Sequence, residues 1–172
     1  MYRRKYVCYN RANLSYNFLM NSNLHKLHEY LKSQNLVSIA TKNGKLWVSV
    51  VYYVVDDKLN LYFLSEPTTE HCKNILKNAE VACSIFNSNQ KVIDKKVGVQ
   101  LHGKASKVNN IEKIKWMLAL WNKVNPGFEA IINLKNMQKK IIKGRIFKIE
   151  PKTIKFFNEV LYGSEGFEVF KF

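Results

Sequence analysis

The chain has 172 residues, 47% of them hydrophobic and 13% aromatic, which suits one globular domain and excludes an intrinsically disordered chain. Its 28 Lys and Arg against 13 Asp and Glu give a net charge of +15, but these cations occur in nearly every segment and cluster only as short pairs or triplets. A solvated basic surface is therefore favoured over a nucleic-acid site. No segment reaches the roughly 20 apolar residues of a membrane-spanning helix. The three cysteines lack metal-binding spacing and indicate a reduced, cytoplasmic setting.

The hydrophobic pattern predicts strands with helices inserted between them. Residues 1–21 are expected to be an irregular, aromatic-rich extension, followed by a helix with one apolar stripe that ends near Asn35. Asn43-Gly44 is typical of a tight hairpin turn between two strands. Helices are expected at 68–78, after Asn110 and within 128–142, and strands at 36–41, 46–55, 59–65, 81–86, 97–105 and 145–157, the last broken at Pro151.

This order of elements predicts an α+β fold over residues 1–172. About six strands without a βαβαβ rhythm favour a small, mostly antiparallel barrel with helices packed outside it. The strand at 46–55 is apolar on both faces, whereas a half-exposed strand alternates. One face is therefore expected to fill the barrel, and the other to meet a second subunit or a cofactor.

The junction from Ser65 to His71 is the best functional clue in the pattern. It places a helix start directly after a strand, where backbone N–H groups lack helical partners and carry the positive end of the helix dipole. Such a junction could hold a phosphate. On the sequence alone, simple helix capping by Thr68, Thr69 and Glu70 is the more common explanation. No glycine-rich phosphate loop, Ser/His/Asp order or paired-carboxylate motif stands out, so catalytic residues are unassigned and no metal site is expected.

Several short motifs follow one another in a recognisable order: Leu46-Trp47-Val48-Ser49, Leu61-Tyr62-Phe63-Leu64-Ser65, Thr69-Glu70-His71, Gly98-Val99-Gln100-Leu101-His102-Gly103 and Ile146-Phe147-Lys148-Ile149-Glu150. Their order and spacing resemble the pyridoxamine 5'-phosphate oxidase-like, FMN-binding split-barrel superfamily, and within it the YhbP-type branch. The resemblance covers most of the chain. It implies a split barrel that forms a homodimer with FMN at the subunit interface.

The resemblance also implies which residues hold the cofactor. Four residues would lie along the flavin ring: Ser49, Val50, Val51 and Tyr52. Three would lie near the ribityl phosphate: Ser65, Thr69 and His71. Leu64 and Gln100 would lie elsewhere in the site. Relatives often have an arginine where this chain has Glu70, and an arginine would pair with the phosphate. The basic strand residues and the C-terminal signature of true pyridoxamine-phosphate oxidases are missing, so vitamin B6 oxidation is not expected.

Three functions remain open at this level. The first is a flavin-dependent oxidoreductase of unknown substrate, in which FMN supplies the redox chemistry. The second is a binding protein without catalysis that carries FMN, haem or a deazaflavin. The third, supported by the charge of +15 alone, is a basic nucleic-acid-binding barrel.

Overall fold

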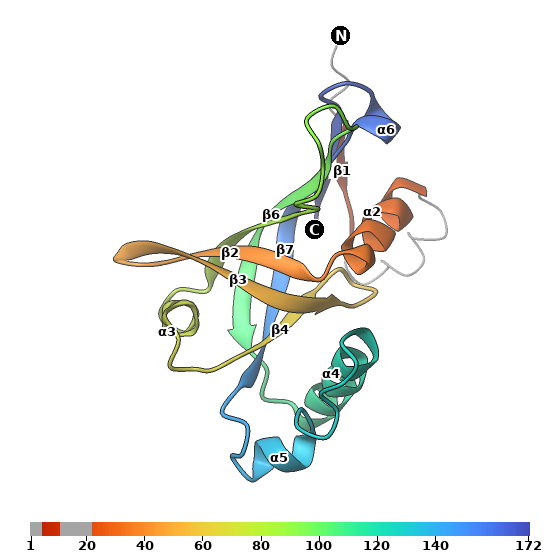
Figure 1. Cartoon of the computed structure of the whole chain (residues 1–172). Helices are drawn as coiled ribbons and strands as arrows, with labels where there is room; N and C mark the ends of the chain where they lie inside the picture. Colours follow the sequence, from red (N-terminus) through yellow and green to blue (C-terminus); the bar gives the residue numbers. More distant parts are fainter. Residues whose placement is uncertain (1–4, 11–21) are drawn as a thin grey trace.

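The computed structural model describes residues 5–10 and 22–172 (Figure 1). One mixed sheet dominates it, and the helices lie around that sheet. None of the described helices has the length and apolar character needed to cross a bilayer. The strands are β1 (Lys5–Cys8), β2 (Leu36–Asn43), β3 (Lys45–Val55), β4 (Leu61–Ser65), β5 (Glu80–Phe86), β6 (Val97–Lys107), β7 (Arg145–Asn158) and β8 (Phe167–Lys171). The helices are α2 (Ser22–Ser33), α3 (Glu70–Lys77), α4 (Ile111–Val124), α5 (Leu134–Gln138) and α6 (Glu159–Tyr162).

Six strands close into an antiparallel barrel in the order β7-β4-β3-β2-β5-β6, because β6 pairs back onto β7. The long strand β7 makes the barrel split. Its first part pairs with β4 (Leu61 opposite Ile149), and its second part pairs with β8 (Ile154 opposite Phe170). The predicted α+β split barrel with outer helices is thus confirmed.

At Gly103 the backbones of β6 and β7 leave no room for a side chain. The register between the two strands shifts between His102 and Gly103, opposite Pro151. A Cβ atom on Gly103 would lie 2.3 Å from the carbonyl oxygen of Glu150. β7 stays continuous through Pro151, so the predicted break is wrong. The irregularity next to that proline is a bulge in β7, where Lys152 is the extra residue opposite the step from His102 to Gly103.

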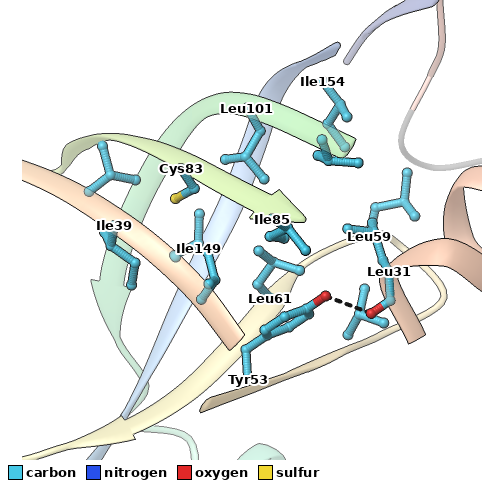
Figure 2. Packing of buried hydrophobic residues seen from close by; sticks show 14 of the residues in the cluster. Leu31, Ile39, Tyr53, Leu59, Leu61, Cys83, Ile85, Leu101, Ile149 and Ile154 are labelled. Carbon is cyan, nitrogen blue, oxygen red and sulfur yellow. Dashed lines mark hydrogen bonds between the residues drawn. The ribbon is translucent and has the colours of Figure 1, made fainter. Parts of the chain in front are cut away.

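The main hydrophobic core fills the barrel. Figure 2 shows aliphatic side chains from several strands pointing toward one another, with Tyr53 reaching across to α2. The Tyr53 hydroxyl donates a 2.6 Å hydrogen bond to the Leu31 carbonyl oxygen. On β6, Val99, Leu101 and Ala105 are buried, as the predicted alternation requires.

A second, smaller core lies on the outside of the barrel under α4. Val54 and Tyr62 from the barrel pack there with Met117 and Trp121 of α4, so these strand positions are covered by a helix. The side chain of Asn110 accepts a 2.8 Å hydrogen bond from the backbone N–H of Lys113, which confirms the predicted cap.

The two ends of the described chain differ from expectation. Residues Lys5–Cys8 of the supposedly irregular extension form β1, which pairs in parallel with β8, and the Tyr9 N–H continues the pairing to the Lys171 carbonyl oxygen at 2.7 Å. Residues 1–4 and 11–21 of that extension lie outside the described residues. β1 pairs with a segment far away in the sequence, so the local pattern carried no signal for it.

Candidate cofactor site

A strip of apolar side chains lies exposed on the outer face of β3. Leu46, Val48, Val50 and Tyr52 point away from the barrel with 77%, 65%, 60% and 53% of their surface exposed. The hairpin of β2 and β3 projects beyond the rest of the barrel in Figure 1. Large apolar patches on a single chain usually mark an interaction site. β3 is expected to need a cover on both faces. On the barrel side, Tyr53 and Val55 are covered but Trp47 is 48% exposed, and the outer face is open in the isolated chain.

A polar cluster lies where β4 ends and α3 begins. The Oγ atom of Ser65 is 2.8 Å from Nε2 of His71 and 3.4 Å from Oγ1 of Thr69. Thr69 Oγ1 is also 3.3 Å from the same ring nitrogen. Ser65 ends β4, and the turn through Pro67 brings the first turn of α3 back over it, so residues two to six positions apart in the sequence converge.

Thr69 occupies the N-cap position of α3, but its side chain does not cap the helix. Its hydroxyl instead donates a 2.7 Å hydrogen bond to the Glu66 carbonyl oxygen. The prediction that the Thr69 side chain caps α3 is therefore wrong. The first N–H groups of a helix have no partner inside it. In α3, the Thr69 side chain accepts no hydrogen bond from them.

Burial keeps this cluster uncharged near neutral pH. His71 is 8% exposed, and its burial lowers the pKa of the ring below its ordinary value of 6.5. Burial raises the pKa of the neighbouring Cys72 thiol, while hydrogen bonds to the Thr69 and Ser65 side chains act against that rise. Glu70 is exposed. The cluster thus offers hydroxyl and imidazole groups beside a helix N-terminus, a set of groups suited to an anion.

The other predicted site residues lie on two faces of the barrel wall. Val50 and Gln100 share the outer face in one row across the sheet, joined through Ser38 and Ser84 by the strand pairing. Ser49 alternates with Val50 and therefore points to the opposite side, where its Oγ accepts a 3.0 Å hydrogen bond from Trp47 Nε1.

Val51, Tyr52 and Leu64, the other predicted residues, have three different surroundings. Val51 lies on the same side as Ser49 and packs against the main core, whereas Tyr52 belongs to the exposed strip. Leu64 packs against the smaller core under α4. The structure therefore joins the three predicted phosphate contacts directly, and it distributes the predicted ring contacts over both faces of β3 and neighbouring strands.

A shallow groove on the outer face, the outer groove, was not foreseen from the sequence. It has a volume of about 520 Å³ and exists because small side chains follow one another on adjacent strands. Its outward-facing lining comprises Ser38, Ala40, Val48, Ala82, Ser84, Gln100, His102, Thr153 and Lys155. His102 at the groove contacts Glu80 through Nε2 at 2.7 Å. The alternation of small residues at 38, 40, 82 and 84 was the available signal for this groove. Within residues 5–10 and 22–172, no three His, Cys, Asp or Glu side chains gather as a metal site.

A closed six-stranded barrel with a shared long strand, an open outer face and a polar β4–α3 junction defines a split-barrel protein. The family model described as pyridoxamine 5'-phosphate oxidase matches residues 24–158. The chain belongs to this family. Among proteins with curated functions, none matches the chain significantly in sequence.

Solved structures share the fold at low sequence identity. HutZ, the haem storage protein from Vibrio cholerae, is 17% identical over 74% of this chain and 88% of its own, with a TM-score of 0.60. A putative pyridoxamine 5'-phosphate oxidase from Listeria innocua is 14% identical over 77% and 95%, with a TM-score of 0.61. An FAD-binding protein from Mesorhizobium loti is 16% identical over 76% and 90%, with a TM-score of 0.58.

Proposed function

We propose that this protein is a homodimeric flavoprotein that binds FMN at the subunit interface and serves as an oxidoreductase. The observation that carries the proposal is the cluster of Ser65, Thr69 and His71 at the start of α3, next to the strand that bears the exposed apolar strip. FMN joins a phosphate to a flat apolar ring. It needs polar donors at one end of its site and an apolar wall at the other.

The phosphate would be held by the cluster. The Ser65 hydroxyl and the first N–H groups of α3 can donate to phosphate oxygens, and His71 adds a ring nitrogen. The Thr69 hydroxyl would donate to the phosphate in place of its bond to the Glu66 carbonyl oxygen. A dianion beside the ring would raise the pKa of His71 from its lowered value, because an opposite charge favours the protonated form. Binding should therefore take up protons near neutral pH.

The ring would lie along β3, and a second copy of the chain would cover the exposed strip. Two copies that meet through this strip would remove Val48, Val50 and Tyr52 from water, which favours association in proportion to the apolar area buried. The bound flavin would supply hydride or single-electron transfer. The chain's own residues would then position it and exclude water from one ring face.

Absorbance spectroscopy of the purified protein tests this proposal. We expect a yellow preparation, or a colourless one that takes up added FMN with a saturable change in the flavin spectrum. Steady-state turnover with NADH or NADPH and an electron acceptor would distinguish an enzyme from an FMN carrier. A protein that stays colourless and leaves the spectrum of added FMN unchanged would contradict the proposal.

Haem is the second candidate ligand, favoured by the outer groove. This groove offers about 520 Å³ of largely apolar, flat surface with His102 beside it, and a flat ring with a histidine ligand suits such a surface. Coordination through Nε2 requires Glu80 to release His102. Titration with haemin should then give a shifted Soret band that His102→Ala removes and that His25→Ala, on exposed α2 surface, preserves.

A further inference from the structure

A large cavity in the described part of the chain lies away from the proposed FMN site. It measures about 830 Å³ and opens between α2, the turn from β3 to β4, and the start of α4. It contains none of the residues of the Ser65 cluster. Tyr62, which lines it, and Ser65 are three residues apart on β4, roughly 10 Å along the strand. We call this cavity the α4 pocket.

Lysines from five separate segments line the α4 pocket. They are Lys32, Lys58, Lys107, Lys113 and Lys148. The acids that line it are Asp56 and Asp57. Three of the lysines have an acidic neighbour, since Lys32 contacts Glu29 at 3.1 Å, Lys113 contacts Asp56 at 3.6 Å and Lys148 contacts Glu150 at 2.9 Å. Excess positive charge in a concave site raises the local concentration of anions.

Two lysines stand out among these five. Lys58 and Lys107 are exposed, and neither takes part in an ion pair with another described residue. They line the pocket from two separate elements, one from the β3–β4 turn and the other from the end of β6. Their ammonium groups are therefore the ones available to an external anion.

A rigid turn holds Lys58 in place. The buried Asp56 carboxylate accepts hydrogen bonds of 2.9 Å from the backbone N–H groups of Lys58 and Asn60, and one of 3.0 Å from the Tyr62 hydroxyl. Leu59 in the same turn is fully buried with φ of 60°, a left-handed conformation that is costly for a bulky side chain. Surrounding contacts must impose such a conformation, and backbone strain of this kind concentrates at binding sites.

An aromatic wall completes the pocket. Trp116 on α4 is 40% exposed, and the Lys113 ammonium lies 3.8 Å from its ring centroid. Tyr62 meets the indole edge-on, with ring centroids 5.5 Å apart. Lys113 therefore lies between Asp56 and the rings of Tyr62 and Trp116. The Trp116 indole thus lies in a pocket that several lysines line. The volume falls within the roughly 300–1,000 Å³ of small-molecule sites.

We propose that the α4 pocket binds a nucleotide-class ligand, a small anion that joins a planar ring to more than one phosphate. Lys58 and Lys107, which lie on two separate elements, contact the phosphates, and Lys113 and Lys148 reinforce the positive field. The planar ring packs against the part of the Trp116 indole that Lys113 and Tyr62 leave exposed. This site is separate from the proposed FMN site, so its occupancy does not depend on the flavin.

Calorimetric titration of the full chain with ADP at low salt tests this inference. We expect saturable binding at one site per chain and a change in tryptophan fluorescence that Trp116→Phe removes. The double variant Lys58→Gln with Lys107→Gln should weaken ADP binding about tenfold or more, a loss of about 1.4 kcal/mol or more. The matched control is Lys139→Gln with Lys143→Gln, which removes the same charge at exposed positions outside the pocket and should change the affinity by less than about twofold.

Three outcomes would overturn the inference. One is the absence of any heat with ADP at low salt. Another is an equal loss in both double variants, because ADP would then respond to the net charge of +15 alone. The last is competition between ADP and FMN for the same site. Inorganic pyrophosphate should bind more weakly than ADP, because it lacks the planar ring that packs against Trp116. Equal affinity for the two ligands would contradict the proposed contact with Trp116.

Discussion

The imidazole of His71 and the hydroxyl of Ser65 are in direct contact, with 2.8 Å between Nε2 and Oγ, at the point where β4 turns into α3. Their contact is part of the structure of a single chain and needs no second subunit. It makes the β4–α3 junction a polar site whose groups can be tested one at a time.

The first prediction concerns FMN affinity. Thr69→Ala and His71→Ala should each weaken FMN binding about tenfold or more, since a hydrogen bond to a charged group contributes about 1.5–3 kcal/mol. Fluorescence titration of the free flavin measures the affinity. Thr68→Ala is the matched control, because Thr68 is exposed and takes no part in the cluster. Equal losses in all three variants would mean that the cluster is not the phosphate site.

The second prediction concerns pH. Burial lowers the folded-state pKa of His71 below 6.5, so the unfolded chain binds more protons than the folded chain once the pH falls below about 7. The free energy of unfolding should therefore decrease as the pH is lowered through 6.5 toward the folded-state pKa, and should be insensitive to this group at higher pH. His28, whose pKa is also lowered chiefly by burial, contributes with the same sign.

Urea unfolding at several pH values measures this dependence. His71→Gln should reduce the loss of stability on acidification, and the double variant with His28→Gln should reduce it further. His25→Gln, at an exposed position of α2, serves as the control. If His71→Gln and the wild type lose the same free energy between neutral and mildly acidic pH, the burial of His71 has no effect on its titration.

The third prediction concerns the crossing of β6 and β7. Gly103→Ala should destabilise the fold by about 1–3 kcal/mol or more, because its Cβ would lie 2.3 Å from the Glu150 carbonyl oxygen and 2.8 Å from Pro151 Cα, and both belong to the backbone. The control is Gly98→Ala on the same strand, where a Cβ would meet its neighbours at 3.6 Å. Denaturant unfolding should separate the two variants. Equal free energies of unfolding for the two variants would contradict the prediction, because β6 and β7 would then make room for a Cβ at position 103 without losing stability.

The fourth prediction concerns the exposed strip on β3. Val50→Glu should convert the proposed dimer into monomers, because it places a charge in the middle of an apolar interface and leaves the barrel core untouched. Light scattering after gel filtration gives the mass, and far-ultraviolet circular dichroism checks the fold. Val160→Glu is a control at another exposed valine. A dimer that survives Val50→Glu would place the subunit contact elsewhere.

Local features of the sequence were sufficient for most of the barrel. The Asn43-Gly44 turn, the alternation on β6 and the Asn110 cap each depend on residues within a few positions, and all three occur in the structure. The expected partial helix within 128–142 is confirmed as α5, and turns occupy the rest of that segment. β1 and β8 could not be predicted in this way, because β1 is stabilised by pairing with β8 and β8 by pairing with β1 and β7.

The candidate site was predictable only in part. The position of a helix start after β4 follows from the pattern, but the convergence of Ser65 and His71 depends on the path of the turn at Pro67. The outer groove and the α4 pocket combine residues from several strands and helices. Sites of this kind depend on strand register and helix packing, which a single sequence does not specify locally.

Sedimentation analysis of the purified protein with FMN, followed through the visible absorbance of the flavin, tests the central claim most directly. Our account predicts that the flavin sediments with a species of twice the chain mass, with one FMN per chain, and that Thr69→Ala with His71→Ala leaves the flavin behind in solution. Flavin that remains unbound by the wild-type protein, or that sediments equally with the double variant, would contradict the account.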